Sequence, residues 1–150
     1  LALPTGEQRI GNHIRLYHKE PLGESNQTFK YAVGGVAKAV FDGKIIVEPS
    51  AQKIQAYQKN NNILLTPTAR VESDPQLEIY ADDVRCSHGA TVGQLDTAAL
   101  FYMRSRGIPE PVARRMLLRS FLDEALEGLH NLDWLKGAVE KILDERLLRP

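Results

Sequence analysis

Short apolar runs rich in Val, Ile, Tyr and Phe fill the chain from Glu7 to about Leu95. Gly, Pro, Asn and Asp separate these runs, which is typical of β-strands joined by turns. The expected strands lie at 14–17, 28–33, 36–41, 44–47, 54–57, 63–66 and 77–80. The expected corners are the Asp-Gly pair at 42–43, the Asn run at 60–62 and the Asp-Pro pair at 74–75.

The spacing between these runs is short and fairly even, and no helical segment separates them. A doubly wound α/β sheet is therefore excluded, because its parallel strands need helical crossovers. A sandwich, a barrel and a β-helix remain. A β-helix stacks parallel strands through short corners, and the Asn run at 60–62 could form stacked turns in it.

A helical period replaces the strand pattern after Leu95. Asp96 is expected to cap the first helix at its N-terminus. Gly107 is expected to end this helix as a residue with left-handed backbone conformation. Pro109 or Pro111 then opens a second helix, where a missing N–H costs little. Its predicted apolar stripe is Val112, Met116, Leu117, Phe121, Ala125, Leu126 and Leu129.

A third helix is predicted to begin at a cap formed by Asn131 or Asp133. Its expected buried side is Leu132, Leu135, Val139, Ile142, Leu143 and Leu147. The chain is therefore expected to divide into a strand-rich region, 1–95, and a helical region, 96–150, within one continuous unit.

Composition and charge exclude several classes of protein. The 150 residues are 43% hydrophobic and 25% charged, which is typical of a globular domain and excludes a disordered chain. Nineteen basic and nineteen acidic residues cancel, so no overall field favours nucleic acid or an anionic membrane. No apolar run approaches the length of a membrane span, and one cysteine excludes an intrachain disulfide and fits a reducing compartment. The start at Leu1 is interpreted as a piece of a longer protein.

Cys86 and His88 form the most reactive cluster, because thiolate and imidazole are soft metal ligands. On a strand, these two residues point to the same face. They could share a metal, or His88 could lower the pKa of the Cys86 thiol. Two ligands do not close a tetrahedral site, so a buried cysteine beside a hydrogen-bonded histidine stays open as the alternative.

Other candidates are weaker. His13 and His18 lack the spacing of the zinc-protease motif and are expected on the surface or in turns. Gly34–Gly35 and the 42–44 segment lack the features of a phosphate loop. Asp82 and Asp83, near Glu72 and Glu78, could form a carboxylate pair for acid–base chemistry or a hard-metal site. A solvated corner is favoured, because adjacent strand residues face opposite sides. The basic patch Arg104, Arg106, Arg114, Arg115 and Arg119 fits either an acidic partner or helical pairing such as Arg119 with Asp123.

The stretch LEIYADDVRCSHGATVG, residues 77–93, resembles the SufB/SufD family of iron-sulfur cluster assembly scaffolds. The likeness continues at 100–108, 39–45, 51–53 and 62–65, and around His13 and His18. Ser-His-Gly-Ala-Thr stands at 87–91 where the SufB branch has Glu-His-Glu-Ala-Thr. Gly89 stands in place of the second Glu, so this stretch is similar to the SufD branch rather than to the SufB branch.

The resemblance implies a right-handed parallel β-helix followed by an α-helical region. It implies a SufB-like subunit paired through the β-helix, and a SufC-like ATPase docked on the C-terminal helices, so that ATP enters only through that partner. A nascent iron-sulfur cluster would form at the subunit interface, with His88 and Cys86 as candidate iron ligands. Nucleic-acid and membrane partners are not expected, and the compartment would be the cytoplasm, or the plastid stroma in a plant.

The family also has further N-terminal sequence and more coils than this chain contains. An open end of unpaired strand is therefore expected, and the isolated chain is expected to pair with itself. Three functions remain to be separated: a non-catalytic scaffold for cluster assembly, an interaction module in which Cys86 and His88 only pack, and a thiol- or metal-dependent enzyme. The residues favour a binding or scaffold role over an enzyme, and the resemblance implies the scaffold for cluster assembly.

Overall fold

The computed structural model describes residues 1–127 and 132–147, without the side chains of 146 and 147. It divides into two compact units, Leu1–Gln94 and Leu95–Pro150. The strands of the first unit are β1 (Arg9–His18), β2 (Glu24–Val33), β3 (Lys38–Val47), β4 (Ile54–Leu64), β5 (Arg70–Ile79) and β6 (Val84–Gly93). The helices of the second unit are α1 (Thr97–Ser105), α2 (Glu110–Asp123), the short 3-10 helix η1 (Glu124–Leu126) and α3 (Asp133–Leu147).

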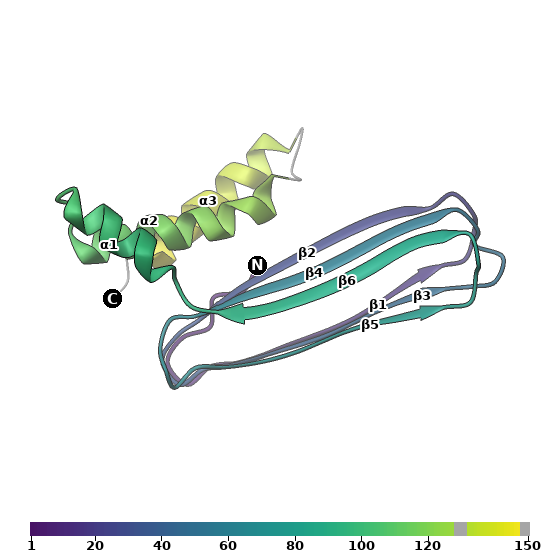
Figure 1. Cartoon of the computed structure of the whole chain (residues 1–150), viewed down its shortest axis with the longest axis horizontal. Helices are drawn as coiled ribbons and strands as arrows, with labels where there is room; N and C mark the ends of the chain where they lie inside the picture. Colours follow the sequence, from purple (N-terminus) through teal and green to yellow (C-terminus); the bar gives the residue numbers. More distant parts are fainter. Residues whose placement is uncertain (128–131, 148–150) are drawn as a thin grey trace. The chain divides into compact units, whose positions relative to one another are not determined.

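The strands form two parallel sheets of three, in the orders β1-β3-β5 and β2-β4-β6, which face each other as two layers (Figure 1). Consecutive strands alternate between the sheets, so the chain winds in coils and each strand pairs with the one a full coil later. Arg9 lies opposite Lys38, and Lys38 lies opposite Arg70. This is the mainly β, β-helix-like arrangement expected from the sequence, followed by helices at the C-terminal end.

The three expected corners are wrong. The Asp-Gly pair at 42–43, the Asn run at 60–62 and the Asp-Pro pair at 74–75 lie inside β3, β4 and β5. β1, β2 and β5 are longer than the apolar runs that predicted them, and β3 and β4 each join two of those runs, because polar or small residues fill interior positions. β6 contains none of the expected strands. Pro75 is tolerated because β5 is an edge strand among the described strands. The corners are at 19–23, 34–37, 48–53, 65–69 and 80–83.

One stack of corners shows why the coils turn where they do. Gly35 adopts φ +63°, and a Cβ there would lie 2.6 Å from the backbone nitrogen of Gly6 in the preceding corner. On the other side, the hydroxyls of Thr66 and Thr68 both donate to the carbonyl oxygen of Gly35, at 2.5 and 2.6 Å. A left-handed residue without a side chain therefore lets three corners stack closely.

The space between the two sheets holds two hydrophobic clusters. One contains Tyr31, Val33, Ala37, Ala39, Phe41 and Ala69. The other contains Ile45, Val47, Ala51, Ile54, Ala56 and Ala81. Buried Gln58, Asn60 and Asn62 lie between them along β4, so the core is polar in the middle.

The helices begin and end close to the predicted positions. Asp96 caps α1 by accepting from the backbone N–H groups of Ala98 and Ala99, and Gly107 follows with φ +85°. Pro109 precedes α2, and Pro111 is in its first turn. The third helix spans Asp133–Leu147. Its proposed cap Asn131, the side chain of Leu147, and Leu129 of the second stripe lie outside the described residues.

The predicted apolar stripes are only partly correct. The buried residues of α2 are Ala113, Leu118 and Leu122, whereas Val112 and Met116 are exposed. On α3, Leu143 is buried and Ile142 is exposed. The apolar periodicity correctly predicted the helices. It did not predict which face of each helix is buried, because two faces have similar hydrophobicity.

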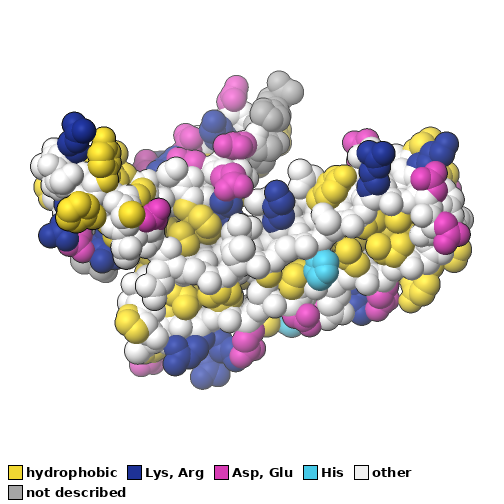
Figure 2. Space-filling model, viewed as in Figure 1, with side chains coloured by type: hydrophobic (Ala, Val, Ile, Leu, Met, Phe, Trp, Pro, Cys, Tyr) yellow, Lys and Arg dark blue, Asp and Glu magenta, His cyan; other side chains and the backbone are white. Residues whose placement is uncertain are grey.

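Acidic and basic side chains are interspersed on the face drawn in Figure 2, in keeping with the zero net charge of the sequence. Within the described part of the chain, no helix has both the length and the apolar character needed to cross a membrane.

Candidate functional site

Strand β6 carries the Cys-Ser-His-Gly segment and lies at an edge of its sheet, paired with β4. The corner before it is fixed to the preceding coil. The side-chain carbonyl of Gln52 accepts from the backbone N–H of Asp83 at 2.9 Å, and the backbone N–H of Lys53 donates to the Asp83 carbonyl at 2.6 Å. These bonds set the register in which β6 begins, and therefore the face on which each of its side chains lies.

Cys86 pairs in register with Ala56, and His88 pairs with Gln58. Because strand residues alternate, Cys86 and His88 share the face that carries the buried side chains of β4, as the sequence predicted. Cys86 is half-buried and packs against the cluster around Ile45 and Ile54. His88 is exposed.

The thiol of Cys86 is not activated in this chain. Burial raises its pKa above the ordinary value, and a backbone hydrogen bond with Ala56 opposes that shift only partly. The possibility that His88 lowers the pKa of this thiol therefore finds no support. Cys86 is a packed residue that would need a change of surroundings, such as metal binding, to become a thiolate.

A row of polar side chains crosses the sheet at the level of His88. Gln27, Gln58 and His88 are consecutive register partners on β2, β4 and β6. Gln58 is fully buried, and its Nε2 donates to Gln27 Oε1 at 2.7 Å. Its Oε1 is buried without a hydrogen-bond partner among the described residues.

The buried asparagines continue this polar interior. Asn62 Nδ2 donates to Asn60 Oδ1 at 2.7 Å and to the backbone carbonyl of Thr91 on β6 at 2.9 Å. Ser73 of the facing sheet donates to Asn60 Oδ1 at 2.6 Å. The sequence analysis missed Gln58, Asn60 and Asn62 as interior residues. Their alternation at every second position was the available signal, because residues two apart on a strand share a face.

His13 and His18 do not form a joint site, because they lie on opposite faces of β1. His13 is on the surface as expected, with Nδ1 3.1 Å from Asp42 Oδ2. His18 is buried, contrary to expectation, with Nε2 2.9 Å from Ser25 Oγ. Burial lowers the pKa of the His18 imidazole, so it is kept neutral as a core group.

The acidic candidates are dispersed. Asp82 and Asp83 are at the exposed corner before β6, as expected. Glu72 and Glu78 form ion pairs with Lys38 and Lys44 of β3, both at 2.6 Å. Across the described residues, no three His, Cys, Asp or Glu side chains gather to hold a metal ion. A metal at Cys86 and His88 would therefore need further donors from outside the described residues.

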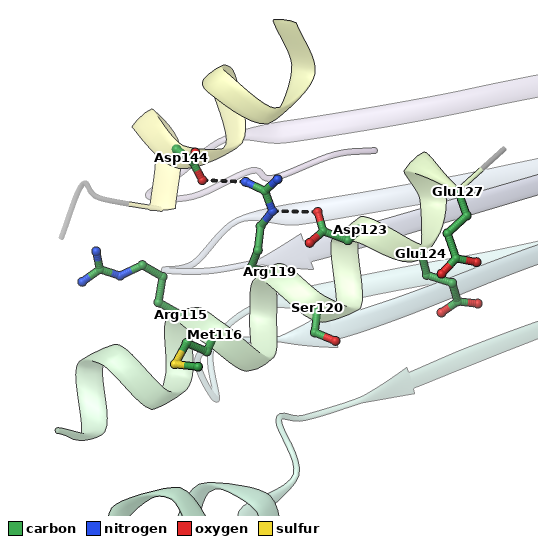
Figure 3. A pocket seen from close by; sticks show the side chains of 8 residues that line it. All are labelled: Arg115, Met116, Arg119, Ser120, Asp123, Glu124, Glu127 and Asp144. Carbon is green, nitrogen blue, oxygen red and sulfur yellow. Dashed lines mark hydrogen bonds and ion pairs between the residues drawn. The ribbon is translucent and has the colours of Figure 1, made fainter. Parts of the chain in front are cut away.

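The helical unit has an open groove of about 700 Å³ lined by α2, η1 and α3 (Figure 3). Arg119 Nε donates to Asp123 at 2.6 Å, as the sequence predicted, and its Nη1 donates to Asp144 of α3 at 2.5 Å. Glu140 of α3 lies 3.7 Å away. Arg119 is thus an internal brace between α2 and α3, whereas Arg115 forms no ion pair among the described residues.

The geometry defines a class of protein: a two-sheet parallel coil that presents a cysteine and a histidine on an edge strand, joined to a helical unit. Residues 1–121 match the family described as SUF system FeS cluster assembly, SufBD core domain. The chain belongs to this family.

Relatives agree with this assignment. The chain is 41% identical over 147 residues to the iron-sulfur cluster assembly protein SufD of Escherichia coli, covering 98% of this chain and 34% of that protein. It is 41% identical over 129 residues to an iron-sulfur cluster assembly SufBD family protein of Synechocystis, covering 86% and 28%. Protein ABCI7, chloroplastic, of Arabidopsis thaliana is 41% identical over 128 residues, covering 85% and 27%. The chain therefore spans about a third of the length of these relatives.

Proposed function

We propose that this chain is part of a non-catalytic scaffold subunit on which an iron-sulfur cluster is assembled, with His88 and Cys86 as its iron ligands at a subunit interface. The observation that carries the proposal is the place of His88, exposed on an edge strand beside Cys86 on the same face. Imidazole and thiolate both bind iron. Two donors are an incomplete set for one chain and a reasonable half-set for an interface.

A SufB-like subunit is the proposed partner at this edge. Strands β5 and β6 are edge strands among those described, so their outer N–H and C=O groups are available to strands of another chain. A partner that continued both sheets would bring its own side chains next to His88. In the absence of that partner, the same edges would let the isolated chain pair with itself.

A SufC-like ATPase is the proposed partner of the helical region. The helices expose several large apolar side chains, which is unusual for a surface that stays in water. They are Phe101, Tyr102, Met116, Trp134 and Ile142. ATP would act only through this partner. Residues 1–95 would thus serve cluster assembly and residues 96–150 ATPase docking, within one continuous unit.

Two further features belong to this proposal. The coils are right-handed, since parallel strands joined by a crossover have that hand in nearly all proteins. The protein would act in the cytoplasm, or in the plastid stroma in a plant. The name of the Arabidopsis relative, which is called chloroplastic, supports the second location for plant members.

One observation favours an alternative, a protein-interaction module with no direct role in cluster ligation. Cys86 packs against a hydrophobic cluster, and burial raises the pKa of its thiol, as expected of a structural cysteine. In this alternative, Cys86 and His88 would shape the edge of β6 without binding iron.

The test is co-expression of the full-length protein with its SufB-like and SufC-like partners, as wild type, His88→Ala and Ser87→Ala. Ser87 is the control, because it is also exposed on β6 but lies on the opposite face. Complex formation and iron and sulfide content are measured after anaerobic reconstitution. The proposal predicts intact complexes throughout and loss of the cluster only in His88→Ala. An intact His88→Ala complex with an unchanged cluster would favour the interaction module.

A further inference from the structure

We infer that Gln58 is a positioning residue for His88: its buried side-chain carbonyl accepts a hydrogen bond from one ring N–H of His88, which leaves the other ring nitrogen for iron. The inference rests on the proposed function, because it concerns how the same site is prepared.

The register places the two side chains next to each other. Gln58 and His88 are direct partners on neighbouring parallel strands, and they share one face. Neighbouring strands lie about 4.8 Å apart, so side chains of this length on one row can contact each other. No residue intervenes between them in the sheet.

The hydrogen bonds of Gln58 leave one atom to be explained. Its Nε2 donates to Gln27 Oε1 at 2.7 Å, which uses the side of the row away from His88. Its Oε1 is buried and has no partner in the described part of the chain. A buried carbonyl without a donor is rare and costly in a native protein. Within this row, His88 is the side chain on the other flank of Gln58.

The facing sheet supplies no donor to Gln58, because the residue opposite its carbonyl is Gly43. A Cβ at Gly43 would lie 2.8 Å from Gln58 Oε1 and 2.5 Å from the ring of Phe41. Gly43 therefore keeps space for the amide without bonding it through a side chain. His88 is exposed and makes no side-chain hydrogen bond to any described residue, so its ring can turn toward the carbonyl.

A hydrogen bond from His88 to Gln58 would decide which ring nitrogen of His88 is free to bind iron. A neutral histidine has one N–H donor and one nitrogen lone pair, and the hydrogen bond made by the donor decides which nitrogen binds metal. Histidines that ligate metals almost always donate their other N–H to an oxygen acceptor. Gln58 would supply that acceptor from the interior, and the free nitrogen would face the exposed edge.

The test begins with the full-length protein, free of metal, with ¹⁵N-labelled histidine. His88→Ala identifies the His88 signals, and their chemical shifts report the tautomer at a fixed pH. The inference predicts one dominant, fixed tautomer in the wild type. Shifts that match a free imidazole, averaged between tautomers, would overturn it without any variant of Gln58.

Three variants separate positioning from packing. Gln58→Met keeps the length but removes the acceptor, and is expected to release the tautomer. Gln58→Glu keeps the length and an oxygen acceptor toward His88, and is expected to restore it. Gln27→Met removes the other partner of Gln58 and is expected to leave His88 unchanged. An unchanged tautomer in Gln58→Met, or an equal change in Gln27→Met, would contradict the inference.

Iron binding by the reconstituted complex then tests whether the hydrogen bond between Gln58 and His88 affects the proposed iron site. Loss of an outer partner of a metal-binding histidine weakens metal affinity roughly 10- to 100-fold. Gln58→Met is expected to show a loss of this size, and Gln58→Glu to recover most of it. If His88→Ala retains iron, the proposed function fails, whereas the tautomer measured without metal still decides the role of Gln58.

Discussion

The side-chain carbonyl of Gln58 lies over Gly43, so close that a Cβ on Gly43 would come within 2.8 Å of it. The ring of Phe41 covers the same glycine, at 2.5 Å from that Cβ position. Gly43 is thus required by packing between two sheets rather than by a turn. Its sequence neighbour Asp42 points to the outer face of β3, where it binds Arg15.

Gly43→Ala is expected to lower the free energy of unfolding by about 1 to 3 kcal/mol, the usual cost of inserting atoms into a packed core. Gly89→Ala is the control, because a Cβ at Gly89 meets nothing within 4 Å. Urea unfolding of both variants measures the difference. If Gly43→Ala were as stable as the wild type, the core would accommodate the added methyl group, and packing would not require glycine at this position.

Asp42 gives the outer face of the first sheet an acid-sensitive contact. Arg15 and His13 donate hydrogen bonds to its carboxylate and lower the pKa of Asp42 to about 2. A carboxyl group with a lowered pKa stabilises the fold above its unfolded pKa, and this contribution disappears as the pH falls toward the folded pKa.

Asp42→Asn is therefore expected to be less stable than the wild type near pH 6, and the gap is expected to close between about pH 4 and pH 2. Urea unfolding across this range measures the gap. Asp82→Asn is the control, because Asp82 is exposed at a corner and forms no ion pair with any described residue. A gap that stayed constant with pH would rule out the charge of Asp42 as its source.

Cys86 is expected to react slowly with iodoacetamide. Burial raises the pKa of its thiol, and the thiolate is the reactive form, so a smaller fraction reacts at neutral pH than for a free thiol. The alkylation rate at pH 7.5 is expected to be below that of glutathione, and to rise on unfolding in urea. A rate equal to or above that of glutathione would show an activated thiol.

Arg119 of α2 reaches α3 through its hydrogen bond to Asp144, whereas its bond to Asp123 stays within α2. Arg119→Met is expected to lower stability by about 1 kcal/mol, because its ion pairs are partly exposed, and to increase amide exchange in α3. Arg115→Met is the matched control, from the same helix but without an ion pair among the described residues. Similar exchange in both variants would mean that Arg119 does not couple the helices.

Sequence patterns predicted the type of each region, but they did not predict the length of the strands and missed β6 as a strand. Apolar runs on either side of Gly43 and of the Asn run at 60–62 looked like separate strands with corners between them. In the structure, Gly43 fits beneath Phe41, and the side chain of Asn62 donates a hydrogen bond to that of Asn60 inside the fold. Turn-forming residues predict a corner only where the chain has no interior partners for them, and such partners come from distant coils.

The sequence predicted the candidate iron ligands, but it did not predict the residues that surround them. The alternation of strand residues correctly placed Cys86 and His88 on one face. The burial of His18, and the row formed by Gln27, Gln58 and His88, depend on register between strands a full coil apart. A local pattern does not contain that register.

Pulsed electron paramagnetic resonance of the reconstituted complex tests the central claim most directly, with ¹⁵N-labelled histidine in this subunit only and the cluster in a paramagnetic state. We predict a ¹⁵N coupling from a ligating imidazole that is present in the wild type and in Ser87→Ala, and absent in His88→Ala. A paramagnetic cluster without any ¹⁵N coupling in the wild type, or with the same coupling in His88→Ala, would contradict the assignment of His88 as an iron ligand.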